Sequence, residues 1–136
     1  MTATATANRS IAIVGTGFSG LCLAIHLKKT GNDSFVLFER ASDIGGTWRE
    51  NTYPGAECDI PSALYSFSFE RNPRWSHKWS EQREILQYVK YCAEKYDLYP
   101  HIRFNKEVLD ARFDEDTGKW RVETDDGSVE HFDAFV

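Results

Sequence analysis

Apolar residues follow two different periods along the chain, and their succession predicts the order of the secondary-structure elements. Residues 11–14 and 34–38 are short runs without a polar face, which is typical of strands buried in a parallel sheet. Between them, apolar positions return at helical spacing from Phe18 or Ser19 to Thr30, and Gly31 follows as a C-terminal stop. The pattern therefore predicts a strand, a right-handed crossover helix and a parallel second strand.

A second helical pattern runs to about Tyr96, with Ser80 as the expected N-cap and Glu81 in the first turn. Its apolar side chains fall on one stripe, which we interpret as part of the core: Ile85, Leu86, Val89, Cys92, Ala93 and Tyr96. Beyond Pro100, residues 101–104 predict a short strand.

Three segments of alternating apolar and polar residues follow, at positions 107–113, 120–124 and 129–135. Gly118 and Gly127 lie in the turns between them, so the three segments predict an antiparallel β-meander. The last apolar strand has no continuation, and we expect the chain to be a fragment of a longer domain. The predicted fold class is α/β, with a parallel sheet, a crossover helix and the meander.

The stretch at residues 41–72 keeps neither period, and glycines and prolines interrupt it. A loop of this length in a compact domain is usually functional or disordered. Its aromatic side chains argue against disorder: Trp48, Tyr53, Tyr65, Phe67 and Phe69. We expect this loop to pack against a ligand or another part of the protein.

The clearest chemical signal is the sequence Gly15-x-Gly17-x-x-Gly20, which stands between the first strand and the first helix. Gly15 permits a tight turn, Gly17 lets a pyrophosphate approach the backbone, and Gly20 lets the helix pack close to the strand. The unpaired N–H groups and the dipole at the helix start then favour a bound anion. This order of elements predicts a dinucleotide site.

Glu39 ends the second predicted strand, nineteen residues after Gly20, where the ribose-binding acid of such a motif is expected. A lone glycine-rich turn also arises by chance, but the strand, turn, helix, strand and acid all occur here in order. Arg40 suggests a 2′-phosphate as in NADP, whereas the neighbouring Glu39 would repel that phosphate. The charges therefore favour a dinucleotide without a 2′-phosphate, such as FAD, over NADP.

Composition narrows the possible partners and compartments. The 136 residues fit one domain, with residues 1–9 expected as a flexible tail and residues 10–136 as the folded part. A net charge of −5 argues against nucleic acid or an anionic membrane as the main partner. No run approaches transmembrane length, and the tail lacks the apolar region of a signal peptide. Three cysteines without paired spacing suggest reduced thiols and a cytoplasmic location, and the histidines lack metal-ligand spacing.

One further pattern lies in the long loop: Gly46-x-Trp48, then Tyr53-Pro54-Gly55 after four residues, then Asp59 after three more. It resembles a motif of the flavin-dependent Baeyer–Villiger monooxygenases, which are relatives of the flavin-containing monooxygenases. The adjoining words Gly45-Gly46-Thr47-Trp48-Arg49 and Cys58-Asp59-Ile60-Pro61-Ser62 match the same family. The resemblance covers about residues 10–136.

This resemblance implies an incomplete Rossmann-like FAD-binding domain and a set of cofactor contacts. By it, Gly15, Gly17, Phe18, Ser19 and Gly20 would hold the FAD pyrophosphate, and Glu39 with Arg40 would lie at the adenosine ribose. The turn of Gly45, Gly46, Thr47 and Trp48 would follow the ribityl chain, with Tyr65 near the flavin and Val108 near adenine. Glu57, Cys58 and Asp59 match the approach of the nicotinamide cofactor, and Asp59 is the candidate catalytic carboxylate, although a loop cap is the plainer interpretation of an aspartate there.

The resemblance also implies the reaction. Such enzymes use FAD, NADPH and O2 to convert a small-molecule ketone into an ester or lactone. No second Gly-x-Gly-x-x-Gly occurs in the sequence, so the NADPH-binding domain is absent from this chain, and we expect no turnover by the chain alone. Two alternatives stay open: a fragment of an N- or S-oxygenating flavin monooxygenase, and a non-enzymatic nucleotide-binding module.

Overall fold

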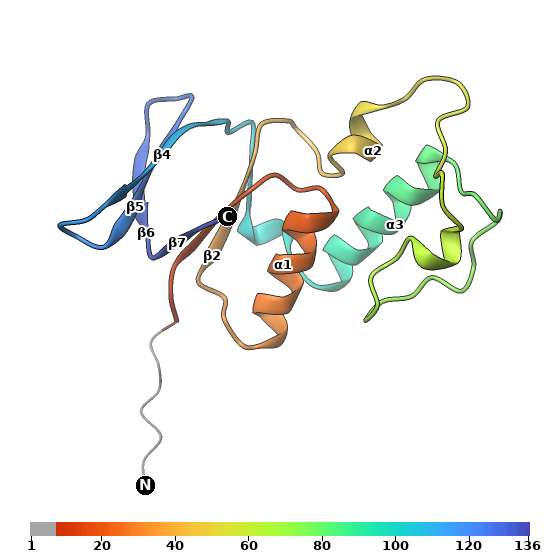
Figure 1. The fold of residues 1–136 in the computed structure, drawn as a ribbon, viewed down its shortest axis with the longest axis horizontal. Coiled ribbons are helices and arrows are strands. Elements are labelled where there is room, and N and C mark those ends of the chain that lie inside the picture. The colour runs from red at the N-terminus through yellow and green to blue at the C-terminus, as the bar shows by residue number, and fades with distance from the viewer. Residues whose placement is uncertain (1–7) are drawn as a thin grey trace, which may run out of the picture.

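A computed structural model describes residues 8–136, so residues 1–7 of the tail predicted at residues 1–9 lie outside the described part. Its central sheet has the strand order β3-β2-β1-β7, all parallel (Figure 1). These strands are β1 (Ile11–Val14), β2 (Phe35–Glu39), β3 (Ile102–Phe104) and β7 (Ala134–Phe135). Helix α1 (Phe18–Lys29) connects β1 to β2, which confirms the predicted strand–helix–strand unit.

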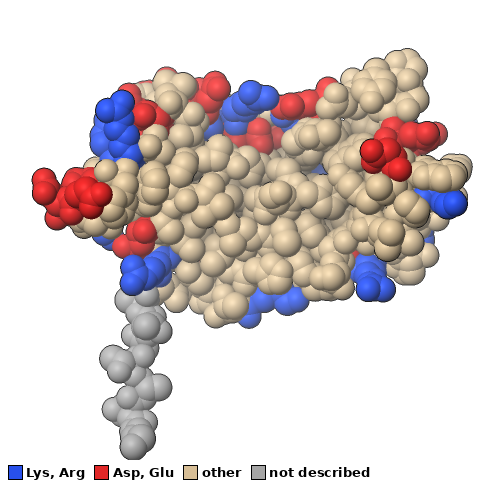
Figure 2. Space-filling view, viewed as in Figure 1, with Lys and Arg blue, Asp and Glu red and all other residues tan. Residues whose placement is uncertain are grey.

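A second, antiparallel sheet has the order β4-β5-β6 and lies on one side of the central sheet, with α1 and α3 on the other (Figure 1). It contains β4 (Val108–Asp114), β5 (Lys119–Thr124) and β6 (Val129–Phe132), and α3 spans Gln82–Lys95. The predicted meander is thus confirmed, and the molecule has three layers. The face over α1 is largely free of Lys, Arg, Asp and Glu side chains (Figure 2).

Alternate residues of the central strands supply two apolar cores, one on each face of the sheet. Ile13 of β1 and Leu37 of β2 pack toward α1 and α3, together with Leu21, Ile25 and Val89. Ala12 and Phe38, on the opposite face, pack against Val122 and Phe132 of the meander. This explains why β1 and β2 have no polar face: both sides of each strand are covered.

The long loop after β2 folds over one end of the sheet and contains two short helices that its sequence did not predict. They are α2 (Thr47–Glu50) and the 3-10 helix η1 (Ser62–Leu64), and a further turn, η2 (Tyr99–His101), precedes β3. Aromatic side chains hold the loop: the Tyr88 hydroxyl accepts a hydrogen bond from Phe67 N at 2.8 Å and donates one to the Glu70 carbonyl at 2.7 Å.

The predicted cap of α3 is wrong. The N-cap is Glu81, and Ser80 lies one residue outside the helix. The backbone of Ser80 is engaged by the loop instead, since its N–H donates to Ser62 Oγ at 2.7 Å and its carbonyl accepts from Cys58 N at 2.9 Å. The Gln82 N–H donates to the Ala56 carbonyl at 2.9 Å, so a loop carbonyl rather than a side chain accepts from the first N–H of the helix.

The predicted third strand of the meander is also too long, because it divides at Asp133. Strand β6 ends at Phe132, and β7 pairs with β1 in the other sheet. Asp133 Oδ2 accepts hydrogen bonds of 2.8 Å from both the N–H and the hydroxyl of Ser10, which directs the chain away from β5 and alongside β1.

Candidate functional site

The glycine-rich turn connects β1 to α1 in the form that its sequence predicts. Gly15 has φ +88° and donates its N–H to the Phe38 carbonyl of β2 at 2.8 Å. A Cβ atom on Gly20 would lie 2.1 Å from the Gly15 carbonyl oxygen, so no other residue fits there. Within the described chain, α1 has no acidic residue in its first turn and no side chain capping its N-terminus. That N-terminus is therefore left to attract an anion.

A second pair of glycines brings the long loop against this turn. Gly45 and Gly46 have φ values of +125° and +51°, and Gly45 N donates to the Thr16 carbonyl at 3.1 Å. A Cβ atom on Gly46 would lie 3.1 Å from Gly17 Cα, which is tighter than an ordinary contact. Glycine at both places therefore lets two backbone turns meet side by side.

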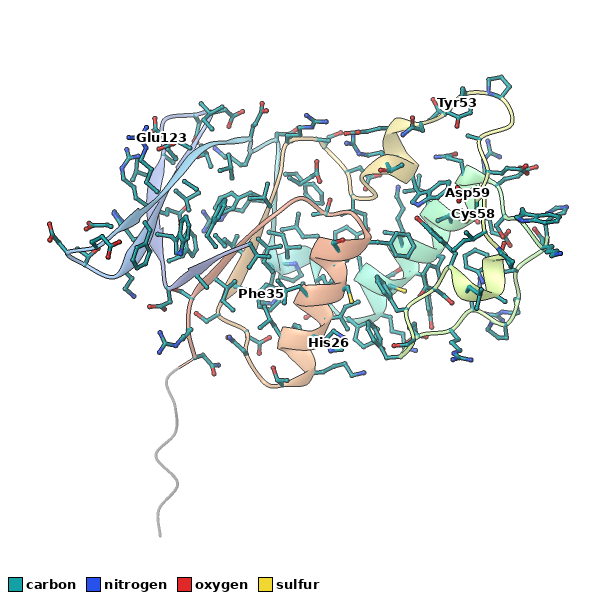
Figure 3. All side chains as sticks on the ribbon, viewed as in Figure 1. His26, Phe35, Tyr53, Cys58, Asp59 and Glu123 are labelled. Carbon is teal, nitrogen blue, oxygen red and sulfur yellow. The ribbon has the colours of Figure 1, made fainter. Side chains whose placement is uncertain are left out.

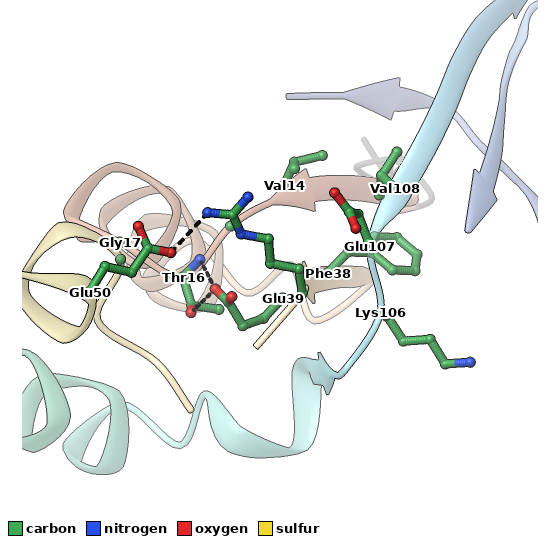
Figure 4. Close-up of a pocket in the computed structure, with 12 residues that line it drawn as sticks. Val14, Thr16, Gly17, Phe38, Glu39, Glu50, Lys106, Glu107 and Val108 are labelled. Atoms are coloured by element: carbon green, nitrogen blue, oxygen red, sulfur yellow. Dashed lines mark hydrogen bonds and ion pairs between the residues drawn. The ribbon is translucent and has the colours of Figure 1, made fainter. Parts of the chain in front are cut away.

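Two adjoining cavities, of about 300 and 340 Å³, follow the glycine-rich turn and share Val14, Gly15, Gly17 and Gly46. We call them together the groove. Its acidic end is lined further by Thr16, Phe38, Glu39, Arg40, Glu50, Lys106, Glu107 and Val108 (Figure 4). Its aromatic end is lined further by Phe18, Ser19, Gly20, Gly45, Thr47, Trp48 and Tyr65.

Glu39 is the buried carboxylate of the acidic end, with only 4 % of its surface exposed. Its Oε2 accepts hydrogen bonds from Thr16 N at 3.1 Å and Thr16 Oγ1 at 2.5 Å (Figure 4). Its Oε1 accepts from Ala41 N at 2.9 Å and lies 3.8 Å from an Arg49 guanidinium nitrogen. The carboxylate is therefore held from both sides, and an ionised carboxylate can accept further donors from a ligand.

The two cations of the acidic end are each paired with a carboxylate. Arg40 pairs with Glu50, with 3.0 Å between a guanidinium nitrogen and a carboxylate oxygen. This hydrogen bond lowers the pKa of Glu50, and it raises the pKa of Arg40. Lys106 donates to Asp126 in the turn between β5 and β6, and this hydrogen bond is the main cause that lowers the pKa of Asp126. Both side chains are oriented by protein partners.

The aromatic end is built from side chains of the helix start and the loop. Trp48 Nε1 donates to the Tyr65 hydroxyl at 3.0 Å, and the Phe18 ring meets the Tyr65 ring edge-on with centroids 5.0 Å apart. The Gln82 side-chain amide donates to the Trp48 carbonyl, which connects α2 to α3. Aromatic faces with one hydroxyl suit a flat, partly polar ligand.

The groove brings together all but three of the residues predicted to bind cofactor. The three exceptions, Glu57, Cys58 and Asp59, lie beside the start of α3 (Figure 3). Cys58 is buried at 2 % exposure, whereas Glu57 and Asp59 face solvent. The catalytic role of Asp59 stays a prediction. In the described residues, no group of three or more His, Cys, Asp or Glu side chains is arranged to hold a metal ion.

Several residues that line the groove were not predicted from the sequence. Thr16 occupies a variable position of the glycine motif, so only its place between Gly15 and Gly17 pointed to it. Glu50, Lys106 and Glu107 belong to no sequence motif. They line the groove only because α2 and the residues just before β4 pass beside it. Across residues 8–136, no helix is long and apolar enough to cross a membrane.

Comparison with known proteins agrees with this geometry. The chain is 44% identical over 119 residues to a Baeyer–Villiger monooxygenase of Streptomyces coelicolor. The matched region covers 88% of the chain and 23% of that protein. Its fold matches cyclohexanone monooxygenase from Rhodococcus sp. Phi1 bound to NADP+ with a TM-score of 0.86 and 37% identity, over 93% of the chain and 25% of that protein. The fold of this chain also matches the OTEMO complex with FAD and NADP, with a TM-score of 0.84 and 31% identity. This match covers 90% of the chain and 24% of that protein.

The chain thus spans about a quarter of the length of these relatives. The predicted resemblance to Baeyer–Villiger monooxygenases is confirmed by the sequence match, and the predicted Rossmann-like α/β fold by the structural matches. Residues 13–92 match the model of the NAD(P)-binding Rossmann-like domain. The chain therefore belongs to the family of NAD(P)-binding Rossmann-like domains.

Proposed function

We propose that this chain is the FAD-binding portion of an NADPH-dependent Baeyer–Villiger monooxygenase, which uses O2 to convert a small-molecule ketone into an ester or lactone. Residues 10–136 would form the N-terminal part of the FAD-binding domain, and the NADPH-binding domain would belong to the full-length protein. We propose that the protein acts in the cytoplasm, in keeping with three cysteines that are free in the described chain.

The observation that carries this proposal is the groove, whose three parts match the three parts of FAD in order. The buried Glu39 carboxylate suits the hydroxyls of the adenosine ribose, which can donate hydrogen bonds to it. The turn at Gly15, Gly17 and Gly20, where side chains would collide, suits the pyrophosphate. The aromatic end with Trp48 and Tyr65 then suits the ribityl chain and the flavin.

The charge at the acidic end favours FAD over NADPH in this groove. Arg40 and Lys106, the two cations of this end, are paired with Glu50 and Asp126. Glu39 and Glu107 add negative charge to the lining. A 2′-phosphate would therefore meet carboxylates and no uncommitted cation.

When bound, FAD would supply the redox chemistry by taking electrons from NADPH and transferring an oxygen atom from O2. This chain's own residues would bind and orient the cofactor: Glu39 by the ribose, the start of α1 by the pyrophosphate, and Trp48 with Tyr65 beside the ring. Glu57, Cys58 and Asp59 lie outside the groove, and we propose that they face the approach of NADPH in the full-length enzyme. Asp59 would there place a carboxylate near the reacting ring.

Two other functions remain as rivals, and they are distinguished by different measurements. A fragment of an N- or S-oxygenating flavin monooxygenase would present the same groove. A full-length protein that oxygenates amines or sulfides but no ketone would establish that function. A folded chain without affinity for FAD would instead support a non-enzymatic module.

The direct test is the visible absorption of the purified chain after incubation with FAD and removal of the excess. We expect a bound flavin spectrum that is lost in Gly17→Trp, which fills the groove, and in Glu39→Arg, which removes the ribose acceptor. Glu115→Trp in an exposed turn and Glu94→Arg at an exposed position of α3 are the matched controls and should keep the colour. A folded but colourless wild-type chain would contradict the proposal.

A further inference from the structure

We propose that Thr16 is a positioning residue, which fixes the Glu39 carboxylate so that the acidic end accepts a ribose with a free 2′-hydroxyl and rejects a 2′-phosphate. This inference rests on the proposed nucleotide-binding function of the groove. It assigns a role to the variable position between Gly15 and Gly17, which the glycine motif itself does not specify.

The contact between the two residues is short, double and shielded from water. Thr16 is fully buried and Glu39 is 4 % exposed, so solvent has little access to the contact between them. Thr16 donates both its N–H and its hydroxyl to the same oxygen, Oε2, with the hydroxyl at 2.5 Å (Figure 4). Hydrogen bonds to an ionised acceptor are about twice as strong as neutral ones.

These bonds also fix which atoms remain for a ligand. The single hydroxyl proton of Thr16 is committed to Glu39, and its N–H is committed as well, so Thr16 has no donor left for a nucleotide. Its carbonyl accepts from Gly45 N at 3.1 Å, which fixes the same residue against the second glycine turn. Thr16 therefore acts through Glu39 and not by touching the ligand with a donor of its own.

A carboxylate held in this way discriminates by chemistry. A ribose 2′-hydroxyl can donate a hydrogen bond to it, whereas a 2′-phosphate dianion has no proton to donate and is repelled. If the hydroxyl of Thr16 is removed, Glu39 Oε2 loses its shortest hydrogen bond, and the Glu39 carboxylate can rotate more freely. The affinity for the free hydroxyl should then fall more than the affinity for the phosphate.

The test compares two soluble probes that differ only in the 2′-phosphate, 5′-AMP and adenosine 2′,5′-bisphosphate, as competitors of bound FAD. We expect wild type to bind 5′-AMP at least tenfold more tightly than the bisphosphate. Thr16→Val and Thr16→Ala remove the hydroxyl, and we expect about tenfold weaker binding of FAD and 5′-AMP and a ratio of the two probe affinities that is smaller by threefold or more. Thr16→Ser keeps the hydroxyl and should restore both values to within about threefold of wild type.

Ser62→Ala is the matched control, because Ser62 is also buried and also donates its hydroxyl, to the Lys78 carbonyl at 3.0 Å, but lies outside the groove. It should leave the preference unchanged. If Thr16→Val weakened the binding of both probes by the same factor and left the preference intact, Thr16 would have a merely structural role and the inference would be overturned. Equal loss in Thr16→Ser, or failure of both Thr16→Val and Thr16→Ala to fold, would also overturn it. Absence of FAD binding by wild type would instead contradict the proposed function.

Discussion

The hydroxyl of Tyr88 on α3 connects two points of the long loop, since it accepts a hydrogen bond from Phe67 N and donates one to the carbonyl of Glu70. Burial is the largest of the causes that raise the pKa of Tyr88. A single neutral hydroxyl on a helix thus satisfies two backbone groups of a segment without regular structure.

Tyr88→Phe should therefore destabilise the chain by about 1–3 kcal/mol, because it leaves the buried Phe67 N–H without an acceptor. Urea unfolding followed by circular dichroism measures this loss. Tyr91→Phe is the control, since the Tyr91 side chain is exposed and its contact to Glu70 is long, at 3.4 Å. Equal stability of the two variants would contradict the role of Tyr88.

Gly20→Ala should be much more harmful than an ordinary glycine substitution. Its Cβ would lie 2.1 Å from a backbone oxygen that cannot move away without opening the turn. Gly31→Ala is the comparison, because Gly31 has φ +79° but open space around its Cβ. We expect Gly31→Ala to cost about 1–2 kcal/mol through backbone strain alone. Denaturant unfolding should show a larger loss for Gly20→Ala, together with loss of FAD binding.

The carboxylate of Glu70 should make stability depend on acid. Lys95 Nζ donates to both of its oxygens at 2.8 Å, and this contact is the main cause that lowers the pKa of Glu70. A lowered folded-state pKa contributes stability that is present above the unfolded value of about 4.3 and is lost as pH falls through the folded value. Thermal midpoints measured from pH 7 to pH 3 should fall less steeply in Glu70→Gln than in wild type. Parallel curves would refute this assignment.

Asp133 should act as a structural connection between the two sheets. Its carboxylate accepts from Ser10 in front of β1 and pairs with Lys119 of β5 at 2.5 Å. We expect Asp133→Ala to lower the urea midpoint of unfolding, because Ser10 and Lys119 lose their acceptor. Asp116→Ala in the exposed β4–β5 turn is the control and should leave the unfolding midpoint nearly unchanged.

The parts of the fold that the sequence predicted correctly depend on residues close together in the chain. The Gly15-to-Gly20 turn and the position of Glu39 follow from one strand–helix–strand unit, so local spacing is enough to locate them. The covered strands β1 and β2 were likewise predictable, because residues buried on both faces show no alternation.

The parts that the sequence did not predict depend on distant partners. The division of the last strand follows from Asp133 meeting Ser10, which lies 123 residues earlier. Serine is a preferred residue type at helix N-caps, but the backbone N–H and carbonyl of Ser80 form hydrogen bonds with Ser62 and Cys58 of the loop. Thr16 gains its role only from its contact with Glu39, because the motif leaves its position open.

The groove is lined by residues from different layers: Glu39 comes from the central sheet, Val108 from the meander and Glu50 from the loop helix α2. A molecule held there would therefore act as a non-covalent cross-link between these layers. Because the ligand binds only the folded chain, it raises the free energy of unfolding, and this gain increases with the logarithm of the free ligand concentration once the site is saturated. Saturation with ligand should accordingly slow amide hydrogen exchange in the meander as well as beside the glycine turn, so that separate layers open as one cooperative unit.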